Sequence, residues 1–293
     1  ELEPGLNTLF GLEYDRYDSE HAEIFDEESS DRAFEEDVML SGFSTAPVKS
    51  EGGSVNFDDA QETYTARYTH ETIALAFSIT EEAVEDNLYD RLASRYTRAL
   101  ARSMSQTKQI KAAAVLNNAF TAGASAIGDG VALCSASHPT INGTQSNVLA
   151  VAADLNETSL EQMLIDVAGA KDERGLKVAI RGQKLIIPKE LQFVAERLLN
   201  SNLRPGSADN DVNATKSMGM LPDGAVVNHF LTDTDAFYIK TDCPNGFKLF
   251  QRTPLRTAME GDFDTGNMRY KARERYSFGV SDWRCVFGTP GAA

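Results

Sequence analysis

The residues that could carry out nucleophilic chemistry lie in one loop near the middle of the chain. His138 follows Cys134, and Ser135 and Ser137 stand between them, so a nucleophile and a general base are conceivable there. Nucleophilic catalysis also requires a carboxylate that orients the base and an oxyanion hole. A His-Pro pair in a glycine-rich loop is more often part of a turn. We therefore interpret His138 as a turn residue and predict no catalytic residues.

One acidic stretch follows the spacing with which a calcium-binding loop begins. Ala214, however, occupies the position of the required glycine, and Met220 occupies that of the bidentate glutamate. The four histidines are far apart in the sequence and lack the spacing typical of a zinc site. We predict no metal site and no cofactor. The residues considered are Asp209, Asp211, Asn213 and Thr215 of the acidic stretch, and His21, His70, His138 and His229.

Asp233 and Asp235 form the last pair with apparent catalytic potential. They lie in the segment LTDTDAF, where turn residues between strands are a better interpretation than a paired acid and base. The common motifs GxSxG, GxxxxGK(S/T), GxGxxG and HExxH are absent from the sequence. The sequence predicts that the protein is not an enzyme. A soluble enzyme with an unrecognised site stays an alternative, and turnover by a stable monomer would support it.

The elements that precede these residues are unusually long. Residues 63–79 are rich in β-branched and aromatic side chains, and as one strand they would span about 55 Å. The apolar residues occupy even positions before His70 and odd positions after Glu71, which predicts a bulge or bend there. Residues 37–48 are the natural partner strand, and a polar segment with two glycines joins the two. We expect a long projecting hairpin.

A long helix should follow this strand. Thr80 can cap it, and if the helix continues towards Ala122 it is about 60 Å long. Between Arg91 and Gly128 the sequence contains six basic residues and no acidic one. Apolar residues recur at helical spacing and predict the buried face. They are Val84, Leu88, Leu92, Tyr96, Ala99 or Leu100, and Met104.

The acidity of the chain is concentrated at its N-terminus. The 293 residues carry a net charge of −16. Residues 1–40 contain fourteen Asp or Glu and only two Arg, which leaves about −4 for the remainder. Such an arm should become ordered on a partner surface, and the acid-free helix is the candidate, in the same subunit or the next. A solvated acidic tail is the alternative. Sequence-specific DNA binding is excluded because phosphate binding requires clustered Lys and Arg.

Length and composition limit the remaining possibilities. The chain is 42% hydrophobic and can bury a core as one elaborate domain or two. No window resembles a membrane span or a signal peptide, so we expect a soluble protein made inside the cell. Three cysteines without close spacing argue against a disulfide framework. A chain that begins with Glu1 is either proteolytically matured or simply numbered from this residue.

The middle of the chain predicts a small mixed sheet with helices packed on it. Thr158 or Ser159 should cap a helix that runs through Lys171, with Leu160, Leu164, Val167 and Ala168 facing inward. A short strand at 185–187 should end at Pro188, and a helix should follow up to Asn200. Residues 201–222 form an expected projecting loop. Residues 226–231, 237–241 and 247–252 should form a meander, with a hairpin turn at 244–246.

The last part, residues 255–287, should return to a sheet near the long helix. Within it, four basic residues alternate with four others, so one strand face should be basic and Glu274 and the Tyr side chains should face the other way. A solvated face and a surface that pairs with acids of another subunit are the two interpretations. The basic residues are Arg269, Lys271, Arg273 and Arg275, and they alternate with Tyr270, Ala272, Glu274 and Tyr276.

Three segments carry a resemblance to a known family. Residues 260–292 read EGDFDTGNMRYKARERYSFGVSDWRCVFGTPGA and are similar to the C-terminal signature of tailed-bacteriophage major capsid proteins of the Mu-like major head subunit family. Residues 129–147 read DGVALCSASHPTINGTQSN and resemble that family's loop after the long helix. Residues 231–252 read LTDTDAFYIKTDCPNGFKLFQR and resemble its following strands. The first 80 residues resemble the family by layout.

The resemblance implies an α+β chain with the HK97-like phage capsid fold. Four segments would be an N-terminal arm (1–37), an extended β-hairpin or E-loop (38–80), a peripheral domain with a spine helix (81–147 and 254–293) and an axial α/β domain (148–253). The implied function is a major capsid protein whose pentamers and hexamers form an icosahedral shell around the double-stranded DNA genome of a bacteriophage. An encapsulin-like bacterial compartment is the alternative, and cargo enzyme in place of DNA would distinguish it.

The resemblance also implies partners and a location. The protein would be a homo-oligomer with a portal protein at one vertex. A scaffold, a maturation protease and decoration proteins are further candidate partners. Assembly would take place in the host bacterial cytoplasm, and the finished protein would belong to the virion. Closed shells require heterologous contacts that form fivefold and sixfold rings, and a long hairpin would supply the reach between subunits.

Overall fold

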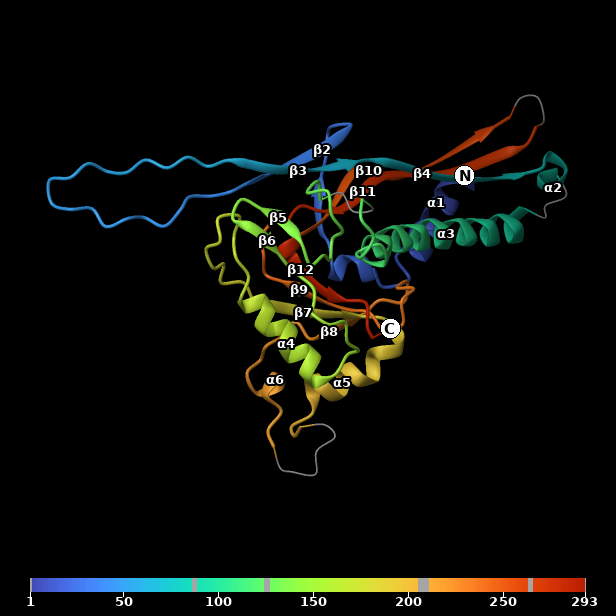
Figure 1. Ribbon diagram of the computed structural model, residues 1–293. Coiled ribbons are helices and arrows are strands. Elements are labelled where there is room, and N and C mark those ends of the chain that lie inside the picture. Colours follow the sequence, from blue (N-terminus) through green and yellow to red (C-terminus); the bar gives the residue numbers. More distant parts are fainter. Residues whose placement is uncertain (1, 86–88, 124–126, 205–210, 263–265, 293) are drawn as a thin grey trace. The chain divides into compact units, whose positions relative to one another are not determined.

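The computed structural model describes residues 2–85, 89–123, 127–204, 211–262 and 266–292 (Figure 1). The chain is α+β and divides into two compact units. The first comprises Glu1–Glu35, Thr69–Ala112 and Leu249–Phe278, and the second comprises Glu36–Tyr68, Ala113–Lys248 and Gly279–Ala293. Within the described residues, no helix combines the length and the apolar character that a membrane span needs.

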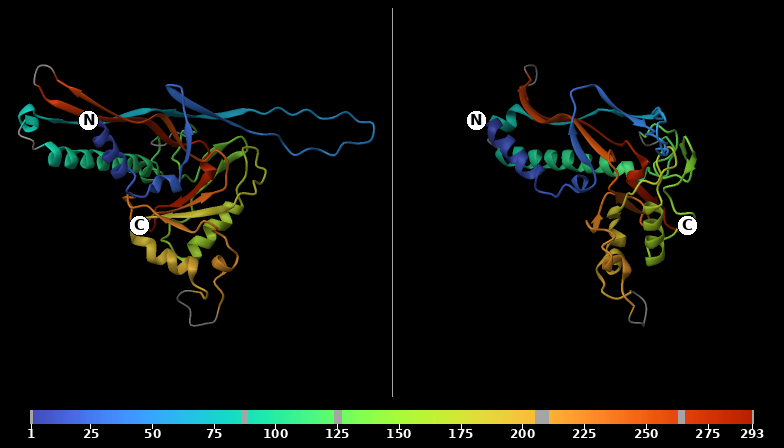
Figure 2. Two further views of the ribbon diagram at one scale, coloured as in Figure 1. Left: turned by 180° about the vertical axis from the view of Figure 1, so that it is seen from behind. Right: turned by 90° about the vertical axis from the view of Figure 1, so that its left-hand side faces the viewer.

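The first unit is built on a four-stranded sheet in the order β1-β10-β11-β4. Strands β11 and β4 are antiparallel, with Met268 opposite Ile79 and Tyr276 opposite Glu71. Helices α1 and α3 lie on the same side of this sheet, as Figure 2 shows. The elements are α1 (Leu2–Tyr14), a 3-10 helix (Glu20–Glu23), β1 (Asp26–Ser29), β4 (Glu71–Ile79), α2 (Glu81–Glu85), α3 (Tyr89–Asn117), β10 (Phe247–Gly261) and β11 (Met268–Val280).

The core of the first unit joins the arm, the long helix and the sheet. Leu6 and Phe10 of α1 pack with Leu100 and Met104 of α3 and with Tyr270 of β11. The return of the C-terminal segment to a sheet near the long helix is therefore confirmed for β10 and β11. Its last strand, β12 (Val286–Thr289), joins the sheet of the second unit instead.

The long helix is shorter than predicted. Helix α3 has 29 residues and is about 44 Å long, and it ends at Asn117 instead of continuing towards Ala122. The Asn117 side chain donates to the Phe230 carbonyl and accepts from the Thr232 N–H, while the Asn118 amide donates back to the Ala114 carbonyl. Such side chains compete with the helical hydrogen bonds and end the helix. Residues 86–88, between α2 and α3, lie outside the described residues.

The buried face of α3 also differs from the prediction in part. Leu100 and Met104 are buried, and Ala99 is exposed, so Leu100 is the correct alternative. Tyr96 is wrong as a core residue because it is 42% exposed, although its ring packs edge-on against Phe77. Val84, Leu88 and Leu92 fall outside the residues whose side chains are described.

The predicted break near His70 is confirmed. Strand β3 (Glu62–Thr69) ends and β4 begins on either side of this residue, and β3 pairs with β2 (Phe34–Leu40) instead of with β11. His70 is 6% exposed, and its two ring nitrogens lie 3.0 Å from the Ser30 hydroxyl and 2.9 Å from the Ser277 hydroxyl. At the break between β3 and β4, the His70 side chain thus forms hydrogen bonds inside the first unit.

The second unit contains a sheet in the order β12-β9-β7-β8, in which only the β7–β8 pair is parallel. Helices α4 and α5 pack on one face of it, against Leu185, Ile187, Phe237 and Ile239. The elements are β5 (His138–Thr140), β6 (Gly143–Gln145), α4 (Glu157–Ala168), β7 (Gly182–Ile187), α5 (Gln192–Asn200), α6 (Ala214–Ser217), β8 (Ala225–Val227) and β9 (Phe237–Thr241), with 3-10 helices at Lys189–Leu191 and Trp283–Cys285.

The helix at the start of this unit begins at a different cap from the predicted one. Asn156 is the N-cap, and its side chain accepts from the Ser159 N–H at 2.9 Å while the Ser159 hydroxyl accepts from the Asn156 N–H. The helix ends at Ala168, before Lys171, because Gly169 follows. The inward positions are confirmed for Leu160, Leu164 and Val167, but Ala168 is exposed.

The predicted meander is wrong. Strands β9 and β10 follow one another in the chain but belong to different sheets, so the turn at 244–246 does not close a hairpin. Asn245 does adopt the positive φ of 59° that a tight turn needs. Both edges of β9 are occupied, by β7 and by β12, and β10 therefore pairs elsewhere. Strand β8 is also shorter than the predicted 226–231.

Candidate functional site

The loop residues with apparent catalytic potential form a buried hydrogen-bond cluster. His138 Nδ1 lies 2.6 Å from Asp129 Oδ2, and its Nε2 lies 3.0 Å from Asn147 Oδ1. The His138 ring stacks on Trp283 at 4.3 Å between centroids. Both ring nitrogens are occupied by these partners, and the Cys134 thiol is fully buried, which raises its pKa. The arrangement therefore supports a packing role for His138.

Asn147 connects this cluster to distant parts of the chain. Its amide nitrogen donates to the carbonyls of Leu133, Trp283 and Val286 at 2.7–3.3 Å, and its amide oxygen also accepts from the Ser135 N–H at 2.8 Å. Its partner His138 and the Asp129 carboxylate that binds the other ring nitrogen were not recognised as a pair from the sequence. The signal was their shared position in the loop that carries the family resemblance.

The remaining candidate residues also have structural partners. Asp233 Oδ1 accepts from the backbone N–H groups of Asp235 and Ala236, as a turn residue does. Asn213 caps α6 and donates to the Leu198 carbonyl. Asp209 lies outside the described residues. Across the described ranges, no group of three His, Cys, Asp or Glu side chains is placed to bind a metal ion.

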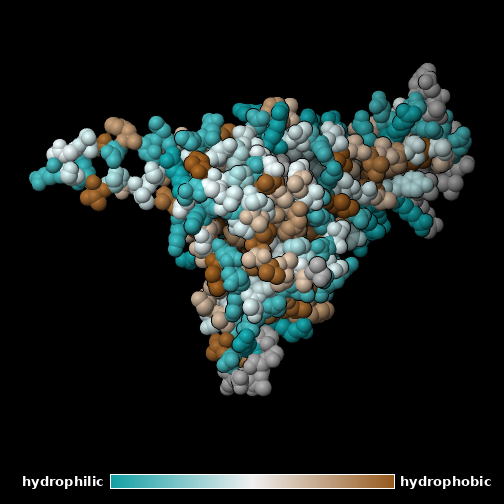
Figure 3. All heavy atoms as spheres, viewed as in Figure 1, coloured by the Kyte–Doolittle hydropathy of each residue, from teal (hydrophilic) through white to brown (hydrophobic). Residues whose placement is uncertain are grey.

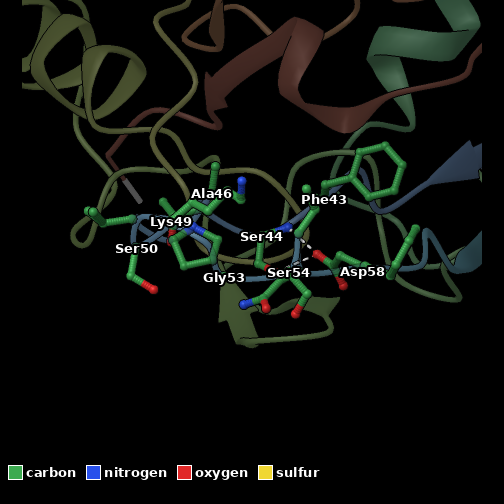
Figure 4. A pocket seen from close by; sticks show the side chains of 14 residues that line it. Phe43, Ser44, Ala46, Lys49, Ser50, Gly53, Ser54 and Asp58 are labelled. Carbon is green, nitrogen blue, oxygen red and sulfur yellow. Dashed lines mark hydrogen bonds between the residues drawn. The ribbon is translucent and has the colours of Figure 1, made fainter.

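The hairpin formed by β2 and β3 continues into a long irregular loop, residues 41–61 (Figure 1). Hydrogen bonds between Ser41 and Gln61 close its base. Beyond them the two runs separate around an opening of about 870 Å³ (Figure 4), where the Ser44 N–H donates to Asp58 at 2.7 Å. Residues 42–60 are all described, and no backbone hydrogen bond joins the two runs there.

Four apolar side chains on this loop are mostly or fully exposed. Phe57 is 97% exposed and Val48 is 100% exposed, while Phe43 and Val55 are 61% and 65% exposed. Figure 3 shows hydrophobic side chains (brown) at intervals along the loop, between hydrophilic ones. Isolated exposed apolar residues are common, but four on one 21-residue loop indicate a surface that binds a partner.

The basic face predicted on the C-terminal strand is present on β11. Arg269, Lys271 and Arg273 are exposed, whereas Tyr270 and Ala272 are buried. The neighbouring positions on β4 that face the same way are small, with Ser78, Ala76 and Ala74 opposite the three basic residues. Arg275 is half-buried. The long basic side chains therefore extend farther from the sheet than the small side chains beside them.

Glu274 and Tyr276 lie on the opposite face from the basic residues, as predicted, and both are buried. The Tyr14 hydroxyl donates to Glu274 at 3.5 Å, and Lys108 Nζ lies 3.9 Å away from the same carboxylate. Burial raises the pKa of Glu274, and the charge of Lys108 opposes this shift.

The first part of the acidic arm, up to His21, lies on the acid-free helix of the same chain. Glu13 is only 7% exposed and contacts Arg102 at 3.7 Å and Arg16 at 3.3 Å. The Arg102 guanidinium also donates to the Tyr17 hydroxyl at 3.1 Å, and Gln109 accepts from the His21 N–H at 3.0 Å. Of the three interpretations of the arm, packing on the helix within the same subunit is the one observed.

A family model described as phage capsid protein matches residues 63–288. The chain belongs to the phage capsid protein family. The match covers α3, strands β4 to β11 and the loop with the buried His138 cluster, and it does not distinguish a Mu-like subfamily. A comparison with curated protein sequences finds no match.

Solved structures of capsids share the fold of this capsid protein. A virus-like particle from Pyrococcus furiosus is 9% identical, with a TM-score of 0.54 and 99% of each chain covered. The capsid of cyanophage P-SCSP1u is 12% identical, with a TM-score of 0.58 and coverage of 92% of this chain and 86% of that one. Mycobacterium phage Che8 is 17% identical, with a TM-score of 0.51 and coverage of 87% and 84%.

These findings identify an HK97-like major capsid protein, a structural subunit of a phage shell. The family match disfavours the encapsulin-like alternative, and the Pyrococcus particle shares only the fold. For a shell subunit the functional residues are those that contact other copies. The exposed loop of residues 41–61 and the basic face of β11 are the strongest candidates.

Proposed function

We propose that this capsid protein forms pentamers and hexamers in an icosahedral shell around double-stranded DNA, and that residues 41–61 bind an adjacent subunit. The exposed Phe43, Val48, Val55 and Phe57 carry the proposal. Burying a valine or phenylalanine side chain contributes about 2 kcal/mol relative to exposure, so these two phenylalanines and two valines favour a partner surface. A contact between different surfaces of identical copies can close into rings.

The basic face of β11 is the proposed electrostatic partner of the hairpin. Glu51, Asp59 and Glu62 are exposed on the hairpin, and Arg269, Lys271 and Arg273 are exposed on β11. Exposed ion pairs contribute little energy individually, but complementary charge fixes the register and orientation of an interface. In this proposal the charged residues set the register of the contact between subunits, and the apolar residues supply most of its binding energy.

The four segments form part of the same proposal: an arm (1–37), a hairpin loop (38–80), a peripheral domain (81–147 and 254–293) and an axial domain (148–253). The subunit has no catalytic role. It assembles in the host bacterial cytoplasm with a portal at one vertex, and scaffold, protease and decoration proteins are candidate partners. The shell encloses DNA without reading its sequence.

The test replaces both loop phenylalanines, Phe43→Ser and Phe57→Ser, in the full chain. We expect particle yield to fall at least tenfold in electron micrographs and by light scattering, with unchanged thermal unfolding of the free subunit, because both side chains are exposed. The control replaces Ser50→Ala and Ser54→Ala in the same loop and should assemble normally. Normal assembly of the double phenylalanine variant would refute the docking role. Cargo protein instead of DNA in native particles would refute the genome-container role.

A further inference from the structure

Four arginines surround a shallow hollow where the arm meets the long helix. The hollow measures about 260 Å³, and its lining consists of Glu13, Arg16, Arg95, Arg98, Ala99 and Arg102. All six residues belong to the first unit. Four positive charges against one negative charge leave an excess of three, on a chain whose net charge is −16.

Contacts within the first unit hold two of these arginines in place. Glu13 pairs with Arg16 and Arg102, and both guanidinium groups lie within 6 Å of the Tyr17 ring, at 5.9 and 5.7 Å from its centroid. The Glu13 carboxylate is nearly buried beneath them. Guanidinium groups that are already positioned lose less conformational entropy when they bind a ligand.

The other two arginines are exposed. Arg95 and Arg98 form no ion pair with any residue whose side chain is described. Together with Arg102 they follow one face of α3, at spacings of three and four residues. The stripe is about 10 Å long, a distance over which a DNA duplex presents about six phosphates.

We infer that this arginine hollow binds the phosphate backbone of double-stranded DNA. The inference rests on the proposed genome-container function and assigns it a contact site. Arginine recognises phosphate oxygens through paired N–H donors, and such contacts carry no sequence information. The arginine stripe on α3 is long enough to contact several phosphates of one duplex. These features favour a nucleic-acid backbone over an acidic segment of another copy.

The test measures binding of a fluorescein-labelled 20-base-pair duplex to the unassembled full chain by fluorescence anisotropy at several NaCl concentrations. The variant is Arg95→Gln with Arg98→Gln. Its matched control is Lys189→Gln with Arg197→Gln, which removes the same charge from an exposed position of the second unit. The variant should lower the slope of log Kobs against log salt by about 2, because each lost phosphate contact removes about 0.9. The control should retain the parental slope.

Two unrelated duplex sequences should lose affinity equally in the variant. An unchanged slope, a loss confined to one sequence, or displacement of the duplex by an equimolar peptide of residues 26–37 would each overturn the inference. Particle yield, measured on the same preparations, reports the proposed function separately. A variant with the parental particle yield and a reduced slope of log Kobs against log salt supports the DNA-binding site. An unchanged slope refutes the site whatever the particle yield.

Discussion

Asn147 contacts stretches of backbone that lie more than 130 residues apart. Its side chain is fully buried, and it completes the hydrogen bonds of His138 and of three carbonyl groups. A buried polar group that loses its partner costs about 1–3 kcal/mol, whereas a formed hydrogen bond contributes about 1 kcal/mol net. Removing Asn147 should therefore cost more through the buried polar groups left without a partner than through the hydrogen bonds themselves.

The first prediction concerns this residue. Asn147→Ala should lower the free energy of unfolding of the free subunit by about 3 kcal/mol, because several buried groups lose their partner at once. Urea denaturation monitored by circular dichroism measures it. The exposed Asn142→Ala is the control and should change stability by less than about 0.5 kcal/mol. A similar effect of both substitutions would contradict the assigned role.

His70 gives a pH-dependent prediction. Burial lowers the pKa of His70 below its usual 6.5, and the nearby Arg275 lowers it further. The folded protein therefore holds His70 neutral, and the unfolded chain binds the proton first. Stability is fully present above pH 6.5 and is lost as the pH falls towards the folded pKa.

His70→Gln should remove the part of the stability loss at low pH that is caused by protonation of His70. Unfolding free energies between pH 7 and pH 5 should fall less steeply in the variant than in the parent. His21, whose pKa burial also lowers, is present in both proteins and does not affect the difference. Parallel pH curves would show that His70 does not titrate in this range.

At the level of single residues, the sequence predicted which side chains are structural better than it predicted their partners. The glycine-rich setting of His138 suggested a turn, but this is wrong, because His138 begins strand β5 and pairs with Gln145 of β6. Its bonds to Asp129 and Asn147 and its stacking on Trp283 depend on the folded loop and on a segment near the C-terminus. Local patterns carry no information about such distant contacts.

At the scale of elements, the start of α4 offers a matched pair of substitutions. Asn156→Ala should destabilise the subunit by about 1 kcal/mol, because the first turn loses its side-chain acceptor. Thr158→Ala changes an exposed residue that does not cap the helix and should have an effect below about 0.5 kcal/mol. Thermal unfolding of both variants measures the difference. A larger effect at Thr158 would contradict the observed cap.

Elements were predictable where the signal lay within them. The parity change of apolar residues located the break at His70, because alternation reports directly which strand face is buried. The end of α3 was missed because Asn117 binds Phe230 and Thr232, which are more than 110 residues away. A turn is present at Asn245, but the hairpin predicted there is wrong, because the choice of pairing edge for β10 depends on β12, the last strand of the chain.

At the scale of the whole molecule, assembly should depend on the basic face of β11. Arg273→Glu should reduce shell yield severalfold, because an exposed cation that orients an acidic partner becomes a repulsive charge. Unfolding of the free subunit should not change, since the side chain is exposed. Arg197→Glu, on α5, is the charge-matched control. Normal shell yield of Arg273→Glu would disprove the pairing.

The charge distribution and the family resemblance were the most reliable whole-molecule signals. Fourteen acidic residues near the N-terminus and an acid-free helix predicted a contact, and α1 packs on α3 in the same chain. The sequence could not decide between the same and the next subunit, since charge complementarity is equal for both. The hairpin was predicted, but its paired part ends at Leu40 and Glu62 because the polar loop beyond lacks alternating apolar residues.

The open backbone of residues 41–61 makes the loop a natural target for proteases. A protease needs an exposed, unpaired stretch of chain, and Lys49 lies in such a stretch. Trypsin should cut free subunits at Lys49 within minutes and leave assembled shells intact if a neighbouring copy covers the loop. Mass spectrometry of the fragments gives the fraction cut. The fraction of subunits cut at Lys49 would then measure, at each time point, how many subunits have not yet entered a shell.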